Sequence, residues 1–165
     1  MIYVSSIVLH REDGEVKEPY EPVIRYATPV VDDAGEKQGV VVATVFADSI
    51  LDELNEEAGQ FEGESATLVN ADGYYLAHPV AEKRWGFELG KEVNLASELS
   101  PEIAEQLLNG GKGTITLDSE LLAYETLNLG SDEASNLIAV TKVPIRSVLA
   151  SVDQFKTSAA LAVFV

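Results

Sequence analysis

Apolar and β-branched residues form short runs along much of the chain, which is typical of strands. Turn sequences that end in glycine separate these runs at Glu12–Gly14, Asp32–Gly35 and Asn70–Gly73. Glycine after an acidic or amide residue supplies the positive φ that tight hairpins need. The pattern therefore predicts antiparallel hairpins. The predicted strands are Ile2–His10, Val23–Val31, Gly39–Phe46, Ala66–Asn70, Tyr74–His78, Gly113–Asp118, Leu121–Leu129 and Leu137–Val143.

Three segments carry apolar residues at helical spacing. The first begins with the capping residue Asp48 and gives a predicted helix over residues 48–60. The second has Ser100 as its cap and Pro101 at its first position, which is a typical helix start. The third starts near Ser147 and continues without a breaker into an apolar end.

An internal repeat indicates two sheets. The sequence of Val23–Leu51 aligns without gaps with that of Leu121–Leu149, at a constant offset of 98 positions. This alignment matches, for example, Val42 with Val140. Both copies read strand, turn, strand and helix. The sequence therefore predicts an α+β protein built from two antiparallel sheets in series.

Length, charge and cysteine content narrow the function. The 165 residues, 46% of them hydrophobic, suffice for one domain or two small ones. A net charge of −17 disfavours binding to nucleic acid or to anionic lipid. The lack of cysteine excludes disulfides, thiolate metal sites and a cysteine nucleophile. Thr157–Val165 carries no charge and is too short to span a bilayer, so it resembles the first half of a cut transmembrane helix or an apolar end packed on its own domain.

No motif predicts catalysis or a metal. His10 and His78 lie 68 positions apart, and neither has a second ligand at zinc spacing. Asn109–Thr114 is glycine-rich, but it follows a predicted helix and precedes a strand, the reverse of a phosphate-binding loop. An acid–base hydrolase using two carboxylates is the remaining enzyme hypothesis, and no positioned base can be named for it.

The candidate ligand-binding residues are polar and aromatic side chains within apolar strands. They either face water or line a small-molecule pocket under a long connection. That connection is the 33-residue segment Pro79–Gly111, which contains one predicted helix and the single tryptophan, Trp85, a candidate core plug. The full candidate set is Arg25, Tyr26, Thr44, Tyr75, His78, Trp85, Tyr124 and Lys142.

Several stretches resemble the extracytoplasmic double Cache sensor domains of bacterial histidine kinases, chemoreceptors and diguanylate cyclases. The stretches are Ile7–Gly14, Pro22–Val30, Gly39–Val42, Leu68–Pro79 and Lys83–Phe87. The resemblance implies PAS-like antiparallel sheets in two modules. Residues 1–47 would be the C-terminal part of a membrane-distal module, 48–60 a linker helix, 61–146 a complete membrane-proximal module, and 147–165 a helix leading into a truncated transmembrane segment.

The resemblance also implies a function. The chain would be a periplasmic domain of a membrane receptor that binds a small molecule without a cofactor, reaches the membrane through its C-terminal helix and pairs as a homodimer. Thr44 stands where amino-acid-binding members carry Asp, so an amino group would lack its counter-charge there. The alternative is a cytosolic PAS-like interaction or cofactor-binding module.

Overall fold

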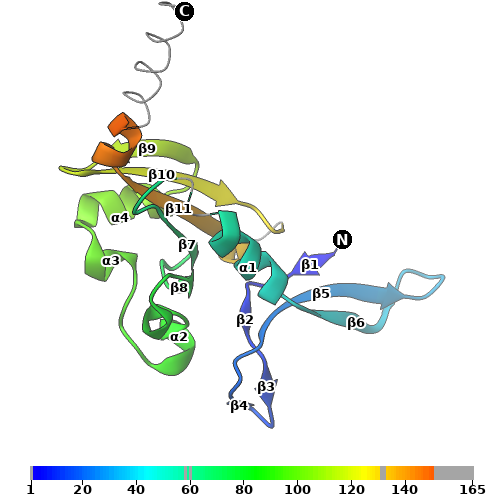
Figure 1. The fold of residues 1–165 in the computed structure, drawn as a ribbon. Coiled ribbons are helices and arrows are strands. Elements are labelled where there is room, and N and C mark those ends of the chain that lie inside the picture. The colour runs from blue at the N-terminus through cyan, green and yellow to red at the C-terminus, as the bar shows by residue number, and fades with distance from the viewer. Residues whose placement is uncertain (1, 58, 60, 131–132, 151–165) are drawn as a thin grey trace, which may run out of the picture.

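The computed structural model describes residues 2–57, 59, 61–130 and 133–150. It shows two main sheets connected by a helix, α1 (Asp48–Glu57), and a smaller two-stranded sheet (Figure 1). The C-terminal sheet is antiparallel, with the strand order β8-β7-β11-β10-β9. Its strands are β7 (Ser65–Asn70), β8 (Tyr75–Ala77), β9 (Lys112–Thr116), β10 (Glu120–Leu127) and β11 (Leu137–Pro144). The predicted α+β class with antiparallel, PAS-like sheets is confirmed.

Both faces of the C-terminal sheet are covered, because neighbouring residues on a strand point to opposite sides. On β7, Leu68 packs in one core cluster with Leu51 of α1 and with N-terminal residues. Its neighbour Val69 packs in the other cluster, with Leu95 and Leu107 of two short helices. These two clusters fix the N-terminal part of the chain on one face of the sheet and the helices on the other.

The connection before β9 contains more helix than the sequence predicts. Besides the predicted helix α4 (Pro101–Leu108), it forms η1 (Ala81–Lys83), α2 (Gly86–Leu89) and α3 (Leu95–Glu98). The side chain of Ser100 accepts from the backbone N–H of Ile103 and caps α4, as predicted. The extra helices are a turn or less, too short for a periodic pattern to reveal.

The N-terminal sheet is centred on β5 (Pro22–Val31), which pairs with β6 (Lys37–Phe46) along one edge. The predicted strand Ile2–His10 is wrong as a single element. It divides into β1 (Tyr3–Val4) and β2 (Val8–Leu9), both paired with β5. The break falls at Ser5, whose hydroxyl accepts from the backbone N–H of Arg25. A separate hairpin joins β3 (Arg11–Glu12) to β4 (Glu15–Val16).

The predicted turns are confirmed. Asp13 and Gly14 both have positive φ, 54° and 85°, as a two-residue hairpin turn requires. The side chains of Asp32 and Asn70 accept backbone N–H groups within their own turns. Short local signals of this kind are readable without any tertiary context.

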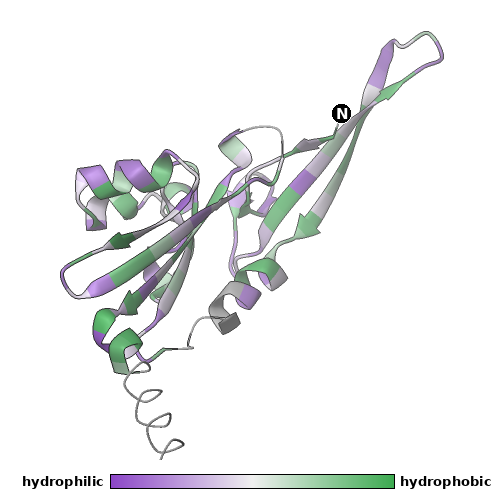
Figure 2. Cartoon of the chain, turned by 90° about the horizontal axis from the view of Figure 1, so that it is seen from above, coloured by the Kyte–Doolittle hydropathy of each residue, from purple (hydrophilic) through white to green (hydrophobic). Residues whose placement is uncertain are grey.

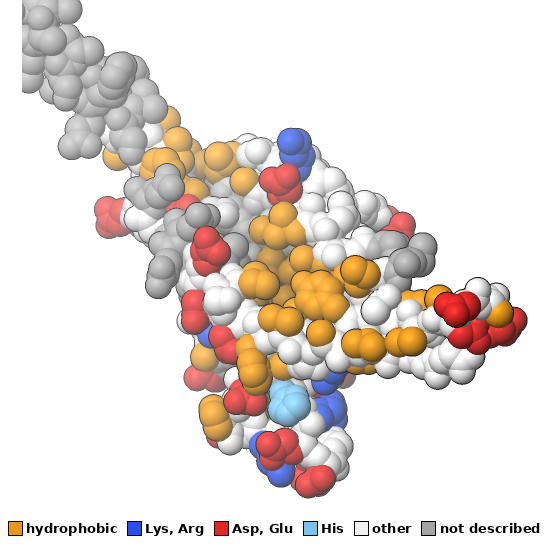
Figure 3. Space-filling view, turned by 90° about the vertical axis from the view of Figure 1, so that its right-hand side faces the viewer, with side chains coloured by type: hydrophobic (Ala, Val, Ile, Leu, Met, Phe, Trp, Pro, Cys, Tyr) orange, Lys and Arg blue, Asp and Glu red, His pale blue; other side chains and the backbone are white. Residues whose placement is uncertain are grey.

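Strand β6 is exposed at all ten positions, although most of them are apolar. Figure 2 shows the β5–β6 hairpin extending away from the rest of the molecule, with hydrophobic residues along it. Figure 3 shows hydrophobic side chains gathered on one face and continuing along a projecting arm with an acidic tip. Exposed large apolar residues of this hairpin include Val31, Val40, Val41, Val42, Val45 and Phe46.

The internal repeat holds as an order of elements but not as a residue register. β5, β6 and α1 correspond to β10, β11 and the helix that begins at residue 145. In the first hairpin Ala27 pairs with Val42, whereas in the second Glu125 pairs with Ala139. The counterpart of Val42 is thus Ala139 and not Val140, and a one-residue shift exchanges the two faces of a strand.

The expected C-terminal helix is only partly described. Residues 145–150 are helical, two residues earlier than the predicted start at Ser147. Residues 151–165, including the apolar end, lie outside the described residues. Within the part of the chain that the structure describes, no helix has the length and apolar character to cross a membrane.

Candidate functional site

A small cavity of about 70 Å³ lies between the C-terminal sheet and α3. Three of the predicted site residues, Tyr75, His78 and Lys142, line it together. They come from β8, from the segment just after it, and from β11. The remaining lining residues are Ser65, Thr67, Pro79, Leu95, Glu98, Leu99 and Val140.

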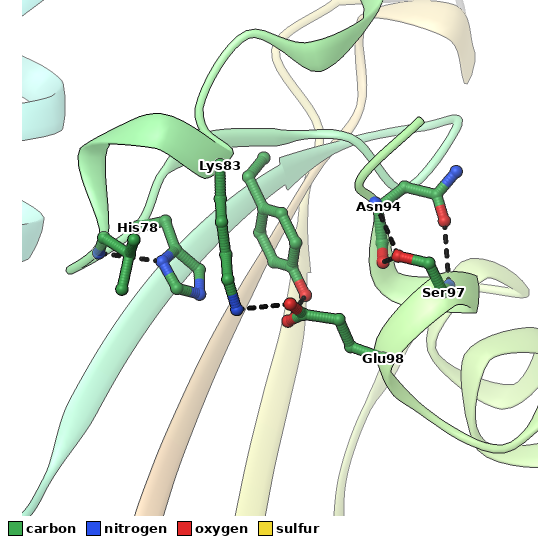
Figure 4. Close-up of polar contacts among 7 residues, drawn as sticks. His78, Lys83, Asn94, Ser97 and Glu98 are labelled. Atoms are coloured by element: carbon green, nitrogen blue, oxygen red, sulfur yellow. Dashed lines mark hydrogen bonds and ion pairs between the residues drawn. The ribbon is translucent and has the colours of Figure 1, made fainter. Parts of the chain in front are cut away.

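A carboxylate closes this cavity. The Tyr75 hydroxyl donates to Oε2 of Glu98 at 2.9 Å, and the Lys83 ammonium forms an ion pair with Oε1 of the same carboxylate (Figure 4). The side chains of Lys83 and Glu98 are 31% and 25% exposed, so the ion pair is largely shielded from solvent. Shielding weakens the screening by water that makes most surface ion pairs negligible.

Local backbone structure places Glu98 at the cavity. Its helix, α3, begins at Asn94, whose side chain accepts from the N–H of Ser97 while the Ser97 hydroxyl accepts from the N–H of Asn94. This capping box fixes the helix start. An isolated bridge between Asn94 and Tyr74 and the burial of Leu95 attach α3 to the sheet. The carboxylate is therefore held by its own helix as well as by its partners.

His78 is fixed in one tautomer. Its Nδ1 accepts from the backbone N–H of Val80 at 2.9 Å, so in the neutral ring Nε2 carries the hydrogen. Its ring packs edge-on against Tyr75, with the ring centroids 4.7 Å apart. No described residue forms a hydrogen bond with Nε2. His78 thus offers an unused N–H donor beside the cavity.

The site shifts the pKa values of its own groups. Burial, followed by the hydrogen bond to Glu98, raises the pKa of Tyr75. Burial acts to raise the pKa of Glu98, but the hydrogen bonds from Lys83 and Tyr75 outweigh it and the net pKa is lowered. Burial, followed by the charge of Lys83, lowers the pKa of His78. Near neutral pH the site therefore holds a charged carboxylate, a neutral imidazole and a protonated phenol.

Lys142 is the one lysine among the described residues that line the cavity. Among the described residues it has no ion-pair partner, whereas Lys83 is paired with Glu98. With Tyr75 and His78, these two lysines place hydrogen-bond donors around one acceptor carboxylate, beside the apolar lining residues Pro79, Leu95, Leu99 and Val140. Such a mixed lining suits a small ligand that carries a polar group.

A larger, open cleft of about 490 Å³ lies between α1 and the loop that holds Trp85. Its carboxylates, from Glu18, Asp48, Asp52 and Glu82, are exposed. Its cations are already engaged, because Arg84 donates to the carbonyl of His78 and Lys91 to the carbonyl of Glu82. The cleft therefore lacks the convergent, shielded polar set of the smaller cavity.

Trp85 is a core residue of the junction between the sheets. It is 5% exposed, and its backbone N–H donates to the carbonyl of Tyr75 at 2.8 Å. It packs with Leu76 and with residues of the N-terminal strands. This matches the core-plug alternative, although Trp85 also lines the larger cleft.

The structure places the other four predicted residues away from the cavity. Arg25, Tyr26 and Thr44 lie on the β5–β6 hairpin, where Arg25 is directly opposite Thr44 and both Tyr26 and Thr44 are exposed. Tyr124 lies on β10, and its hydroxyl accepts from the side chain of Gln106 on α4. The structure therefore distributes the eight candidates over separate regions.

Sequence reasoning missed Glu98 and Lys83 as site residues. Glu98 is one of 28 acidic residues, and nothing in its local pattern distinguishes it. Lys83 falls in a segment that the family resemblance singles out, but its ion-pair partner is 15 positions away. Only the folding of the connection over the sheet brings the two together.

A family model for the sensor domain of bacterial histidine kinases matches residues 2–139. This match spans most of the chain and agrees with the two-sheet architecture. The chain belongs to the bacterial histidine kinase sensor domain family. No curated protein sequence matches this sensor domain.

Solved structures share the fold of the sensor domain. The extracellular domain of vpHK1S-Z8, assigned as a histidine kinase, superposes with a TM-score of 0.71 at 21% identity, covering 92% of this chain and 53% of that one. The periplasmic sensory domain of the Campylobacter jejuni chemoreceptor Tlp1 gives 0.66 at 18%, covering 90% and 50%. The ligand-binding domain of the Pseudomonas aeruginosa PAO1 chemoreceptor PctC, solved with GABA, gives 0.57 at 18%, covering 86% and 55%. The sensor domain thus spans about half the length of these structures.

Proposed function

We propose that this sensor domain is an extracytoplasmic part of a bacterial transmembrane receptor and that it binds a small molecule in the cavity closed by Glu98. The observation that carries the proposal is the convergence of Tyr75, His78 and Lys142 with Glu98 of α3. We call the short helices η1, α2 and α3 together the lid. The ligand-bound neighbour PctC supports small-molecule binding on this fold. The extracellular and periplasmic origin of the neighbours does not favour the cytosolic alternative.

The proposed signal path runs from the cavity to the C-terminal helix. Lys142 lies on β11, three residues before the helix that begins at residue 145. A ligand that favours one position of β11 shifts the population of helix positions by its difference in affinity. In this proposal the helix over 147–165 continues toward the membrane, and the domain itself performs no catalysis.

The N-terminal part has a separate role in this proposal. Residues 1–47 would be the C-terminal part of a membrane-distal module, and residues 61–146 the membrane-proximal one. The observation that supports this division is the exposed apolar surface of β6. An exposed apolar surface of this kind is typical of a sheet that packs against further protein. Pairing of two receptors into a homodimer belongs to the same proposal.

A thermal-shift screen with small carboxylates, amines and sugars tests the binding proposal. We expect at least one class to raise the melting temperature of the wild-type protein and to lose most of that effect in Lys142→Met, which removes the charge from the cavity. The matched control Lys112→Met removes an exposed charge on β9 and should retain the effect. Equal responses of the two variants, or no response to any compound, would contradict the proposal.

A further inference from the structure

The side chains that line the cavity closed by Glu98 include the donors Tyr75, His78 and Lys142, and Lys83 lies beside it as the ion-pair partner of Glu98. Lys83 and Tyr75 already bond to a carboxylate, while Lys142 and the Nε2 hydrogen of His78 have no partner among the described residues. Charged donors around a shielded space favour an anionic ligand, because charge-assisted hydrogen bonds are the stronger ones. In a protein with 28 acidic and 11 basic residues, two lysines beside one carboxylate stand against the overall composition.

Among the described residues, Glu98 is the one acid that lines this cavity, and it already bonds to Tyr75 and Lys83. Glu98 presents to Tyr75 and Lys83 the same two oxygens that a free carboxylic acid would present. Its side chain comes from a one-turn helix at the edge of the cavity and not from the sheet beneath it. A rotation of this side chain toward solvent would release both donors without disturbing β8 or β11.

We infer that Glu98 is a built-in competitor and that the cavity takes a small monocarboxylate, which displaces Glu98 from Tyr75 and Lys83. This inference rests on the proposed function and names its ligand class. The free volume of about 70 Å³ is several times the roughly 10–15 Å³ that one water molecule needs. With the space vacated by the Glu98 carboxylate, it suits a two- or three-carbon acid.

Displacement of Glu98 would also connect binding to the lid. In the structure, Glu98 ties α3 to Lys83 at the end of η1 and to Tyr75 on β8. A bound acid would take over Tyr75 and Lys83 and free α3 from both contacts. Glu98 must leave before the acid can bind. The apparent affinity is therefore the intrinsic affinity multiplied by the fraction of molecules in which Glu98 is already displaced.

Titration calorimetry with acetate and propionate, and with acetamide and propionamide as neutral isosteres, tests the inference. We expect weak binding of the acids to the wild type, about tenfold tighter binding to Glu98→Gln, and no binding of the amides. The control Glu105→Gln removes one exposed charge from α4 and should bind like the wild type. Circular dichroism melting of each variant establishes that it is folded.

Two results would overturn the inference. One is equal affinity of the acids for the wild type and Glu98→Gln. The other is the absence of acid binding to both proteins. If a different class of compound then stabilises the protein and depends on Lys142, the competitor inference fails and the proposed function stands. If no compound of any class binds, the proposed function fails as well.

Discussion

At the scale of single residues, the site depends on one carboxylate and its donors. Tyr75 is buried and donates to Glu98, so removing its hydroxyl removes one donor from a charged acceptor. Individual residue roles of this kind were only partly predictable. Tyr75, His78 and Lys142 stood out as polar groups in apolar strands, whereas Glu98 resembled every other surface acid until the fold gave it partners.

The substitution Tyr75→Phe should lower the free energy of unfolding by about 1 kcal/mol, the usual net value of one hydrogen bond. The loss of stability is moderated because Glu98 retains its ion pair with Lys83. Urea unfolding measures it, and Tyr20→Phe, at an exposed position, is the matched control with an expected change below about 0.5 kcal/mol. An equal loss in both variants would contradict the role assigned to the Tyr75 hydroxyl.

The depressed pKa of Glu98 predicts a pH dependence. A carboxyl group whose folded pKa lies below its unfolded value stabilises the fold above the unfolded pKa and loses that contribution as pH falls through the folded pKa. The wild type should therefore be more stable than Glu98→Gln near neutral pH, and the difference should shrink below the ordinary pKa of 4.5. Melting temperatures of both proteins between pH 7 and pH 3 measure it, and a difference that grows on acidification would contradict the account.

At the scale of elements, strands and turns were predictable and the lid was not. Asn70 and Asp32 form their turns through bonds to nearby backbone, so the local sequence suffices. The short helices α2 and α3 depend on contacts with the sheet. The gapless repeat predicts the correct order of elements but the wrong register in β11. The two hairpins have different connections, and an alignment at one constant offset cannot include that difference.

Gly86, at the start of α2, is the glycine of the lid at which an added side chain would collide with neighbouring backbone. A Cβ there would lie 2.8 Å from the carbonyl oxygen of Lys91 and 3.1 Å from that of Val93. We expect Gly86→Ala to destabilise the protein by about 1–3 kcal/mol, the cost of overpacking. Gly39→Ala is the control, since that site has open space and ordinary backbone. Equal stability of the two variants in urea unfolding would show that the lid tolerates the added methyl group.

At the scale of the whole molecule, the two ends of the chain differ in how fully they are packed. The C-terminal sheet is covered on both faces, whereas β6 exposes apolar residues and has a free edge. Edge strands with exposed apolar side chains are sites of association. The sequence predicts the apolar strand itself, but a run of apolar residues cannot tell which partner covers it.

The isolated 165-residue chain should therefore self-associate through the β5–β6 hairpin. Val41→Lys places a charge on β6 and should shift sedimentation velocity toward monomer. Val80→Lys adds the same charge at an exposed position outside the hairpin and should leave association unchanged. A wild-type chain that stays monomeric at all accessible concentrations would contradict this prediction.

Ligand binding at the cavity closed by Glu98 can be located by amide NMR shift mapping with the compound that most raises the melting temperature. We expect the largest shifts at Tyr75, His78, Glu98 and Lys142, with smaller ones continuing into the helix at residues 145–150. Shifts confined to the β5–β6 hairpin, or to the cleft beside Asp48 and Asp52, would contradict binding at this cavity.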